Sequence, residues 1–182
     1  DEFAALVDGK TQPNGFEVSL STLSAALRGF KTPRYCVIAG FPGSGKTLLA
    51  GQFLTDIAST GTPCLMISCE MTAQQIMQRF IGTYGRLPSE LLSDPLSYAR
   101  KQNRRTVSKE ELNAFRKAYR AIKDMPLHFE EPVSPRIGQI ITMIRRAHKR
   151  HGVRVIGIDY LQLIQVADAS SKEQELTQIS HA

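Results

Sequence analysis

The sequence has no run of 18 or more apolar residues, so it offers no candidate for a membrane-spanning helix. No secretory signal peptide is visible either, and the chain begins at Asp1 without a methionine, which leads us to expect a piece of a longer protein. Cysteines are few, and the spacings of Cys36, Cys64 and Cys69 suit no zinc site. We expect buried, reduced thiols and therefore a cytoplasmic protein.

Internal repeats and low-complexity segments are also absent, and no aromatic residues interleave with the basic ones as in a base-stacking platform. The net charge of +6 is unevenly distributed. Residues 1–99 carry 7 basic and 8 acidic side chains, whereas residues 100–154 carry 15 basic and 5 acidic ones. The basic middle third suits a polyanionic partner such as nucleic acid, although a solvated helix surface explains the same charges.

The most informative feature that is present is an eight-residue run that fits the pattern GxxxxGK(S/T) of phosphate-binding loops: Gly40-Phe41-Pro42-Gly43-Ser44-Gly45-Lys46-Thr47. Such a loop follows a strand and opens a helix. Residues 35–39 form an apolar, β-rich run, and apolar residues recur at helical spacing from Leu48 onward. The alternative is a glycine-rich turn without a ligand, but this context favours a site for a nucleoside triphosphate.

The chemistry of the loop assigns a role to each part of it. Glycines allow backbone N–H groups to turn towards phosphate oxygens, and the helix that opens near Gly45 adds unpaired N–H groups and a positive dipole end. Lys46 is expected to reach the β- and γ-phosphates, and the Thr47 hydroxyl to bind Mg²⁺. We take the nucleotide-binding residues to be the whole loop, from Gly40 to Thr47, together with Leu48.

Strands and helices alternate along the rest of the chain. We expect buried strands at residues 35–39, 64–68 and 153–158 and a short one at 127–129. Helices are expected at 20–30, after the phosphate-binding loop, after Thr72, after Ser108 and from Ser134-Pro135 to Gly152, with a short one from Ser171. Residues 1–14 look like a linker or docking segment, and residues 82–107 look irregular. This order predicts an α/β fold, with a mostly parallel sheet covered by helices on both faces.

Two helix starts carry a capping box, in which a Ser or Thr is followed three residues later by Glu or Gln. These are Thr72 with Gln75 and Ser108 with Glu111. In the helix after Ser108 we expect a single buried stripe, made of Leu112, Phe115, Tyr119 and Ile122.

Two carboxylates follow predicted strands, Glu70 after 64–68 and Asp159 after 153–158. Ligands of parallel α/β sheets bind outside the carboxyl ends of the strands, so both acids should lie near the phosphate-binding loop. Asp159 has the position of a Walker B acid that holds Mg²⁺ through its water shell, and Glu70 is placed to deprotonate an attacking water. For each acid, the alternative is a solvated or capping carboxylate.

Two runs are similar to motifs of the DnaB-type replicative helicases: Ser68-Cys69-Glu70-Met71, followed by Gln75 and Arg79, and Ile158-Asp159-Tyr160-Leu161-Gln162-Leu163-Ile164. The resemblance extends from about Gly15 to Ser180. It implies a RecA-like P-loop NTPase core over residues 15–182, and an enzyme that uses Mg-ATP to move along single-stranded DNA and unwind duplexes. It also implies a ring-shaped homo-hexamer, a primase and a helicase loader as partners, no membrane, and a bacterial or phage source. By this resemblance, Lys46 and Thr47 bind nucleotide and magnesium, with Lys46 also acting in catalysis, and Glu70 is the catalytic carboxylate.

The sequence departs from the family in three places. Cys69 stands where the family usually has Leu, and Pro42-Gly43-Ser44 differs from the common Pro-Ser-Met. The loop after Asp159 lacks an arginine, which leaves Lys172 as the candidate for DNA contact. The family's sensor strand, further DNA loops and arginine finger would lie beyond Ala182, so we expect a domain incomplete at its C-terminal end. Because such fingers contribute about 10³–10⁵-fold, we expect the isolated chain to hydrolyse ATP poorly.

Two other functions fit part of the sequence. A RecA-type recombinase shares the fold and has a Glu after its second strand, but it acts in filaments rather than in closed rings. A nucleotide-gated docking module of the replisome would bind ATP without unwinding DNA.

Overall fold

A three-stranded parallel sheet forms the centre of the protein in our computed structural model, which describes residues 15–27, 29–31 and 33–165. The strand order is β4 (Leu127–Glu130), β3 (Cys64–Ser68), β5 (Val155–Asp159). Ile67 pairs with Glu130 on one side, and Ser68 pairs with Asp159 on the other. The carboxyl ends of all three strands therefore meet at one edge of the sheet.

The central strand, β3, is buried along its whole length, as predicted. Its side chains alternate between two apolar clusters. Cys64 and Met66 belong to a cluster with α3, α4 and α7, whereas Leu65 and Ile67 belong to a second cluster with α8. A strand that packs on both faces has no polar side, which explains its uninterrupted apolar sequence.

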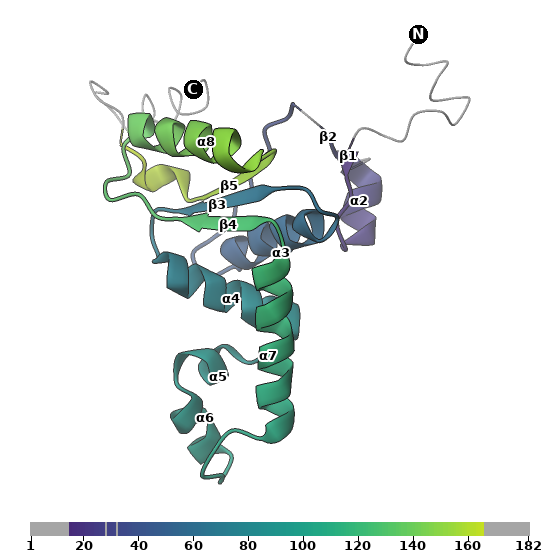
Figure 1. The fold of residues 1–182 in the computed structure, drawn as a ribbon, viewed down its shortest axis with the longest axis vertical. Coiled ribbons are helices and arrows are strands. Elements are labelled where there is room, and N and C mark those ends of the chain that lie inside the picture. Colours follow the sequence, from purple (N-terminus) through teal and green to yellow (C-terminus); the bar gives the residue numbers. More distant parts are fainter. Residues whose placement is uncertain (1–14, 28, 32, 166–182) are drawn as a thin grey trace.

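Helices cover both faces of the sheet, as predicted (Figure 1). On one face lie α3 (Lys46–Ser59), α4 (Ala73–Gly85) and the C-terminal half of α7 (Lys109–Asp124). On the other lies α8 (Ile137–His151), which ends at Gly152 in the left-handed conformation that the sequence predicts for a C-terminal cap. The two predicted capping boxes, at the starts of α4 and α7, are also confirmed.

The N-terminal part of the described chain is a small unit beside α3. Strand β1 (Gly15–Phe16) pairs antiparallel with β2 (Phe30–Lys31), and α2 (Ser21–Leu27) connects them. The predicted helix 20–30 is thus shorter than expected, since Phe30 belongs to β2. The ring of Phe30 packs against that of Phe53 on α3, with the two centroids 5.0 Å apart.

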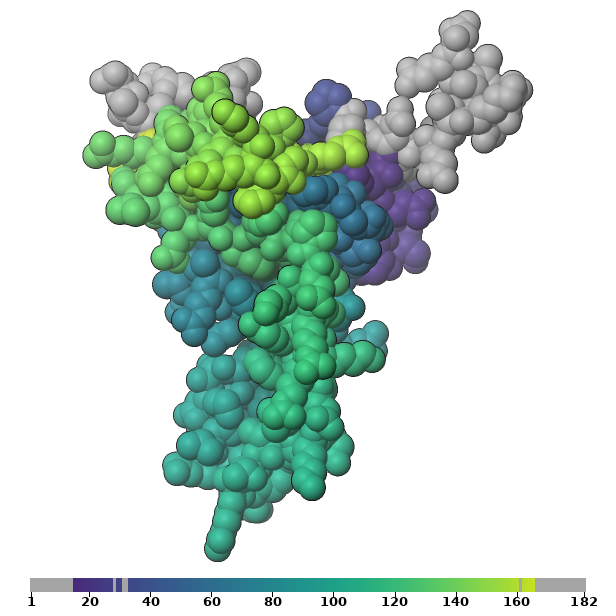
Figure 2. Space-filling view, in the orientation of Figure 1, coloured from purple at the N-terminus to yellow at the C-terminus, as the bar shows by residue number. Residues whose placement is uncertain are grey.

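An extension projects from the core on the side of α4 (Figures 1 and 2). It contains α5 (Ser89–Ser93), α6 (Pro95–Lys101) and the N-terminal half of α7, and we call residues 89–116 the arm. The expectation of an irregular segment at 82–107 was therefore wrong in part, because α4 continues to Gly85 and two short helices follow. The single buried stripe of α7 was also wrong: Ile122 is buried, but Leu112 is 41% exposed and Tyr119 40%. Leu112 lies in the half of the helix that extends into the arm, away from the sheet (Figure 1).

Residues 35–39, predicted as a buried strand before the phosphate-binding loop, form no strand. Tyr35 is 63% exposed and Val37 61%, and the backbone of this segment forms no hydrogen bond with another described residue. The strand predicted at 153–158 does form, as β5, but the expectation that it is buried was wrong. Within the described part of the chain it has only one strand neighbour, and Ile156 is 38% exposed. An apolar run becomes a strand only where a neighbouring strand satisfies its N–H and C=O groups.

The helix predicted from Ser134-Pro135 begins instead at Ile137. The backbone before it pairs with a distant segment: Ile137 N–H donates to the Gln165 carbonyl (3.0 Å), and Gln165 N–H donates to the Pro135 carbonyl (2.7 Å). This pairing holds the chain extended where the local sequence favours a helix start. The expectations for residues 1–14, for the helix from Ser171 and for Lys172 lie outside the described residues.

No helix in the described ranges is both long enough and apolar enough to cross a bilayer.

Candidate nucleotide-binding site

Glycine occurs in residues 40–47 for two different structural reasons. Gly43 (φ 75°) and Gly45 (φ 89°) adopt the left-handed conformation, which L side chains rarely do. At Gly40 the reason is space: a Cβ atom there would lie 2.7 Å from Ser44 Oγ and would force that side chain to move. The loop thus has glycine for its backbone conformation at Gly43 and Gly45 and for space at Gly40.

The loop leads directly into α3. Gly45 is the N-cap residue and Lys46 the first residue of the helix, as predicted, and no side chain caps this end. A helix start leaves backbone N–H groups without intrahelical partners, and these groups together with the helix dipole favour an anion. The start of α3 therefore has the electrostatic character of a phosphate site.

Lys46 lies folded over the loop. Its Nζ atom donates hydrogen bonds to the carbonyls of Gly40 and Phe41, each at 3.0 Å. The ammonium group is thus held at the mouth of the loop by carbonyl oxygens, where a phosphate group would bring stronger, negatively charged acceptors.

Thr47 and Asp159 meet although 112 residues separate them in the sequence. Thr47 Oγ1 donates to Asp159 Oδ2 at 2.6 Å, joining the first turn of α3 to the last residue of β5. Asp159 is only 6% exposed. This pair forms the contact between the phosphate-binding loop and a strand-end carboxylate that the sequence reasoning anticipated.

Glu70 lies in the turn between β3 and α4 at the same edge of the sheet. The turn is attached to β5, because Cys69 N–H donates to the Asp159 carbonyl at 2.7 Å. The Glu70 side chain is exposed and forms no hydrogen bond or ion pair with any other described residue. The structure therefore brings the Glu70 turn to Asp159 but shows no contact between the Glu70 carboxylate and the loop.

Burial favours the protonated form of Cys64, at the start of β3, and of Cys69, directly after the end of β3. It raises the pKa of Cys64 to about 12, and burial, followed by the nearby charge of Asp159, raises the pKa of Cys69. The expectation of three buried thiols is confirmed for Cys64 only: Cys69 is half-buried, and Cys36 is exposed on the segment that forms no strand.

Two further features, one at this edge and one towards the amino-terminal end of the strands, were not anticipated from the sequence. Glu131, which follows β4, accepts a hydrogen bond from the first N–H of α4, at Ala73 (2.7 Å). The rings of His128 and His151 stack with their centroids 4.1 Å apart. The strand predicted at 127–129 is followed directly by Glu130, and no sequence motif singled out Glu131.

Within the described residues, no group of three or more His, Cys, Asp and Glu side chains could hold a metal ion. Mg²⁺ does not need such a group, because it is commonly bound through one or two protein ligands, waters and substrate phosphates. The Thr47 hydroxyl and the buried Asp159 carboxylate are oxygen donors of the kind Mg²⁺ prefers, so the residues present fit this ion.

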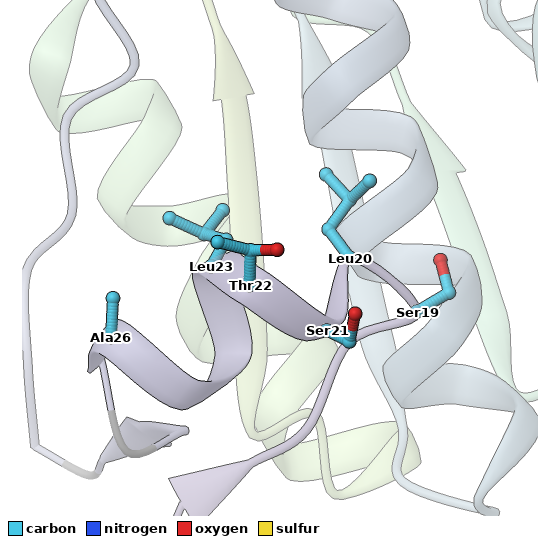
Figure 3. A pocket seen from close by; sticks show the side chains of 6 residues that line it. All are labelled: Ser19, Leu20, Ser21, Thr22, Leu23 and Ala26. Atoms are coloured by element: carbon cyan, nitrogen blue, oxygen red, sulfur yellow. The ribbon is translucent and has the colours of Figure 1, made fainter.

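A separate hollow of about 490 Å³ lies along α2 (Figure 3). It is lined by Ser19, Leu20, Ser21, Thr22, Leu23 and Ala26 and includes none of the candidate site residues.

A glycine-rich loop that opens a helix and a buried carboxylate at the end of a parallel strand are features of the P-loop NTPases, the class that includes RecA-like ATPase domains. The fold agrees with a solved structure titled as a DnaB-like replicative helicase and its interactions with primase, with a TM-score of 0.82 and 22% identity over 99% of this chain and 42% of that one. Residues 15–182 match the DnaB-like helicase C-terminal domain, and the chain belongs to this family.

Relatives of known name support this assignment. The replicative DNA helicase DnaB of Geobacillus stearothermophilus is 27% identical over 173 residues, which cover 92% of this chain and 36% of that protein. A probable plasmid replicative DNA helicase of Chlamydia trachomatis is 30% identical over 147 residues, covering 80% of this chain and 30% of the relative. The chain thus spans about a third of the length of these relatives.

Proposed function

We propose that this chain is the motor domain of an ATP-dependent replicative DNA helicase, which binds and hydrolyses Mg-ATP at the carboxyl edge of its sheet. The observation that carries the proposal is the contact between Thr47 and Asp159, which joins the phosphate-binding helix to a buried strand-end acid. Membership of the DnaB-like family supports the class of reaction and of substrate.

Each residue of the loop has a defined part in this proposal. The N–H groups at the start of α3 bind phosphate oxygens, together with the backbone of residues 40–45 and of Leu48. Lys46 exchanges its two carbonyl partners for the β- and γ-phosphates and balances the charge that develops on them. When bound, Mg²⁺ supplies Lewis-acid stabilisation of the phosphate oxygens, with Thr47 as a direct ligand and Asp159 acting through water.

Glu70 is the proposed general base. A carboxylate exposed at the same edge, and not engaged by any described side chain, is available to orient and deprotonate a water. Its turn is attached to the backbone of Asp159, so the base and the metal-binding acid share one rigid support.

For the whole protein, we propose movement along single-stranded DNA, a homo-hexameric ring, and contacts with a primase and a loader in the cytoplasm of a bacterial cell. Family membership and the primase named with the structural neighbour support this extension. Lys172 remains our candidate for DNA contact.

The test uses the full-length protein and two substitutions. Lys46→Ala should abolish binding of a fluorescent ATP analogue, whereas Glu70→Gln should bind it normally and lower kcat by about 10²–10⁴-fold. Exposed residues of the same type on the arm, in Lys101→Ala and Glu90→Gln, serve as matched controls. Normal turnover in Glu70→Gln would show that another group is the base.

A strand-displacement assay with and without ATP tests the motor function itself. Nucleotide binding without displacement would favour the docking module, and filaments instead of rings in electron micrographs with ATP and single-stranded DNA would favour a recombinase. If the basic middle third contacts DNA, log affinity should fall with log salt concentration by about 0.7 per phosphate contacted.

A further inference from the structure

The turn that carries Glu70 is held by hydrogen bonds from its backbone to three other groups at the sheet edge. Cys69 N–H donates to the Asp159 carbonyl (2.7 Å), Met71 N–H to Ser68 Oγ (3.0 Å), and Thr72 N–H to Gln75 Oε1 (3.0 Å). The first of these comes from β5, the second from the end of β3 and the third from α4 itself.

Ala73 is the next residue, and its N–H has a different kind of partner. The capping box of α4 joins Thr72 and Gln75 to each other, so it leaves the N–H of Ala73 free. That N–H donates to Glu131 Oε2 at 2.7 Å. Glu131 belongs to the loop after β4, and its negative charge at the start of α4 also complements the helix dipole.

We propose that Glu131 is a positioning residue for the Glu70 turn, which rests on the proposed role of Glu70 as the base. Strand β4 is a direct neighbour of β3, with Glu130 in register with Ile67, so Glu131 leaves the sheet edge beside the turn. By binding the first N–H of α4, it fixes the C-terminal side of the turn while Asp159 fixes the N-terminal side. Glu70 is thereby held between the ends of β4 and β5.

The adjacent residue Glu130 provides a matched comparison. It occupies the end of the same strand and carries the same charge, but Arg146 on α8, rather than α4, is its partner (2.7 Å). Two consecutive glutamates therefore connect β4 to the helices on opposite faces of the sheet, and only Glu131 reaches the side that bears Glu70.

The experiment compares Glu131→Ala, Glu131→Gln and Glu130→Ala in the full-length protein. Glu131→Ala should lower kcat for ATP hydrolysis by about tenfold, because small displacements of a catalytic group are costly, with less than about a twofold change in the affinity for an ATP analogue. Glu131→Gln keeps an oxygen acceptor for Ala73 N–H and should restore kcat to within about twofold. Glu130→Ala should leave kcat unchanged.

Hydrogen–deuterium exchange measures how firmly the Glu70 turn is held, and the measurement does not depend on catalysis. Amides at residues 71–76 should exchange faster in Glu131→Ala than in wild type, and should stay protected in Glu131→Gln and Glu130→Ala. Unchanged exchange in Glu131→Ala would overturn the proposal, as would an unchanged kcat or an equal loss in the Ala and Gln variants. A wild-type protein without ATPase activity would instead overturn the proposed function, and exchange at the turn would still decide whether Glu131 holds it.

Discussion

In the sheet layer, stability comes mainly from buried apolar side chains, whereas in the arm it comes largely from charged and polar side chains near the surface. Leu65 and Ile67 on β3 are completely buried. In the arm, Tyr98 donates to Glu111 (2.9 Å), which also accepts two hydrogen bonds from Arg104 (3.0 and 2.9 Å) and closes the capping box of α7. The arm contributes few buried apolar side chains, among them Leu91 and Ala99.

Because of this difference, we expect the two regions to respond differently to salt and pH. The candidate nucleotide site is attached to strands that pack mainly through apolar contacts, so we expect its geometry to depend less on salt and pH than that of the arm. The arm depends on ionised groups, and these respond to pH. We therefore expect the arm to open under conditions that leave the sheet and the candidate site intact.

The largest expected effect concerns the apolar packing of the sheet layer. Leu65→Ala removes a side chain that is 0% exposed in the cluster with α8 and should lower the free energy of unfolding by about 2–5 kcal/mol. The same substitution in the arm, Leu112→Ala, should cost about 1 kcal/mol or less, because Leu112 is 41% exposed. Urea denaturation measures the free energy of unfolding of both variants. Similar losses in the two variants would show that the regions do not differ in apolar packing.

A smaller effect is expected where α3 crosses α4 beneath the sheet. A Cβ atom at Gly51 would lie 2.8 Å from the buried ring of Phe80, so Gly51→Ala forces that ring to move. We expect a net loss of about 1–2 kcal/mol, since overpacking costs about 1–3 kcal/mol and the gain in helix propensity offsets up to about 1 kcal/mol.

Gly138→Ala in α8 is the matched control for this prediction. A Cβ atom there meets nothing within 4 Å, so only the helix propensity remains and the melting temperature should rise slightly. A rise in both variants would indicate that the Phe80 ring adapts without cost.

The features that local sequence determines were the ones predicted correctly. The fully apolar run at 64–68 is β3, and the spacings of Thr72 with Gln75 and of Ser108 with Glu111 form capping boxes. The rule that parallel strands end together anticipated the meeting of Thr47 and Asp159. In each case, residues close in sequence or one general property of the fold carried the information.

Features that depend on a particular distant partner were missed. Residues 35–39 are apolar enough for a strand, but the described chain places no strand beside them. Ser134-Pro135 favours a helix start, yet the pairing with Gln165 delays the helix to Ile137. The hydrogen bond from Ala73 N–H to Glu131 spans 58 residues, and no local pattern in the sequence could specify it.

The contribution of ionised groups to the stability of the arm can be tested by changing the pH. The Arg104 hydrogen bonds, followed by that of Ser108 N–H, lower the pKa of Glu111 to about 2, from an ordinary value of 4.5. A depressed carboxyl pKa contributes stability that is complete above about pH 4.5 and is lost as the pH falls towards 2. NMR signals of Tyr98 and other arm residues should therefore shift over this range before those of β3 do.

Glu111→Gln is the variant that isolates this effect. It keeps an acceptor for Ser108 N–H and removes the charge, so the acid-induced change at Tyr98 should largely disappear while β3 stays unaffected. Simultaneous loss of arm and sheet signals in the wild-type protein would show that the two regions unfold as one.

The smallest expected effect lies at the outer edge of the sheet, where an ionisable group belongs to the buried layer. Burial, followed by the charge of the stacked His151, lowers the pKa of His128 on β4, and Glu130 opposes the shift. Because the folded state resists protonation, the unfolded state takes up a proton first as the pH falls below about 6.5, and stability decreases there.

His151→Ala removes the second cause and keeps most of the first, so the pKa of His128 should rise but stay below its ordinary value of 6.5. Titration of the His128 ring signals by NMR measures this shift, with Arg150→Ala at the same exposed helix end as the control. If burial is the main cause, the pKa of His128 in His151→Ala will recover only a minor part of the difference from its ordinary value. A rise to the full ordinary value would show that the charge of its partner, rather than the apolar layer, sets the protonation of His128, and the edge of the sheet would then behave like the arm.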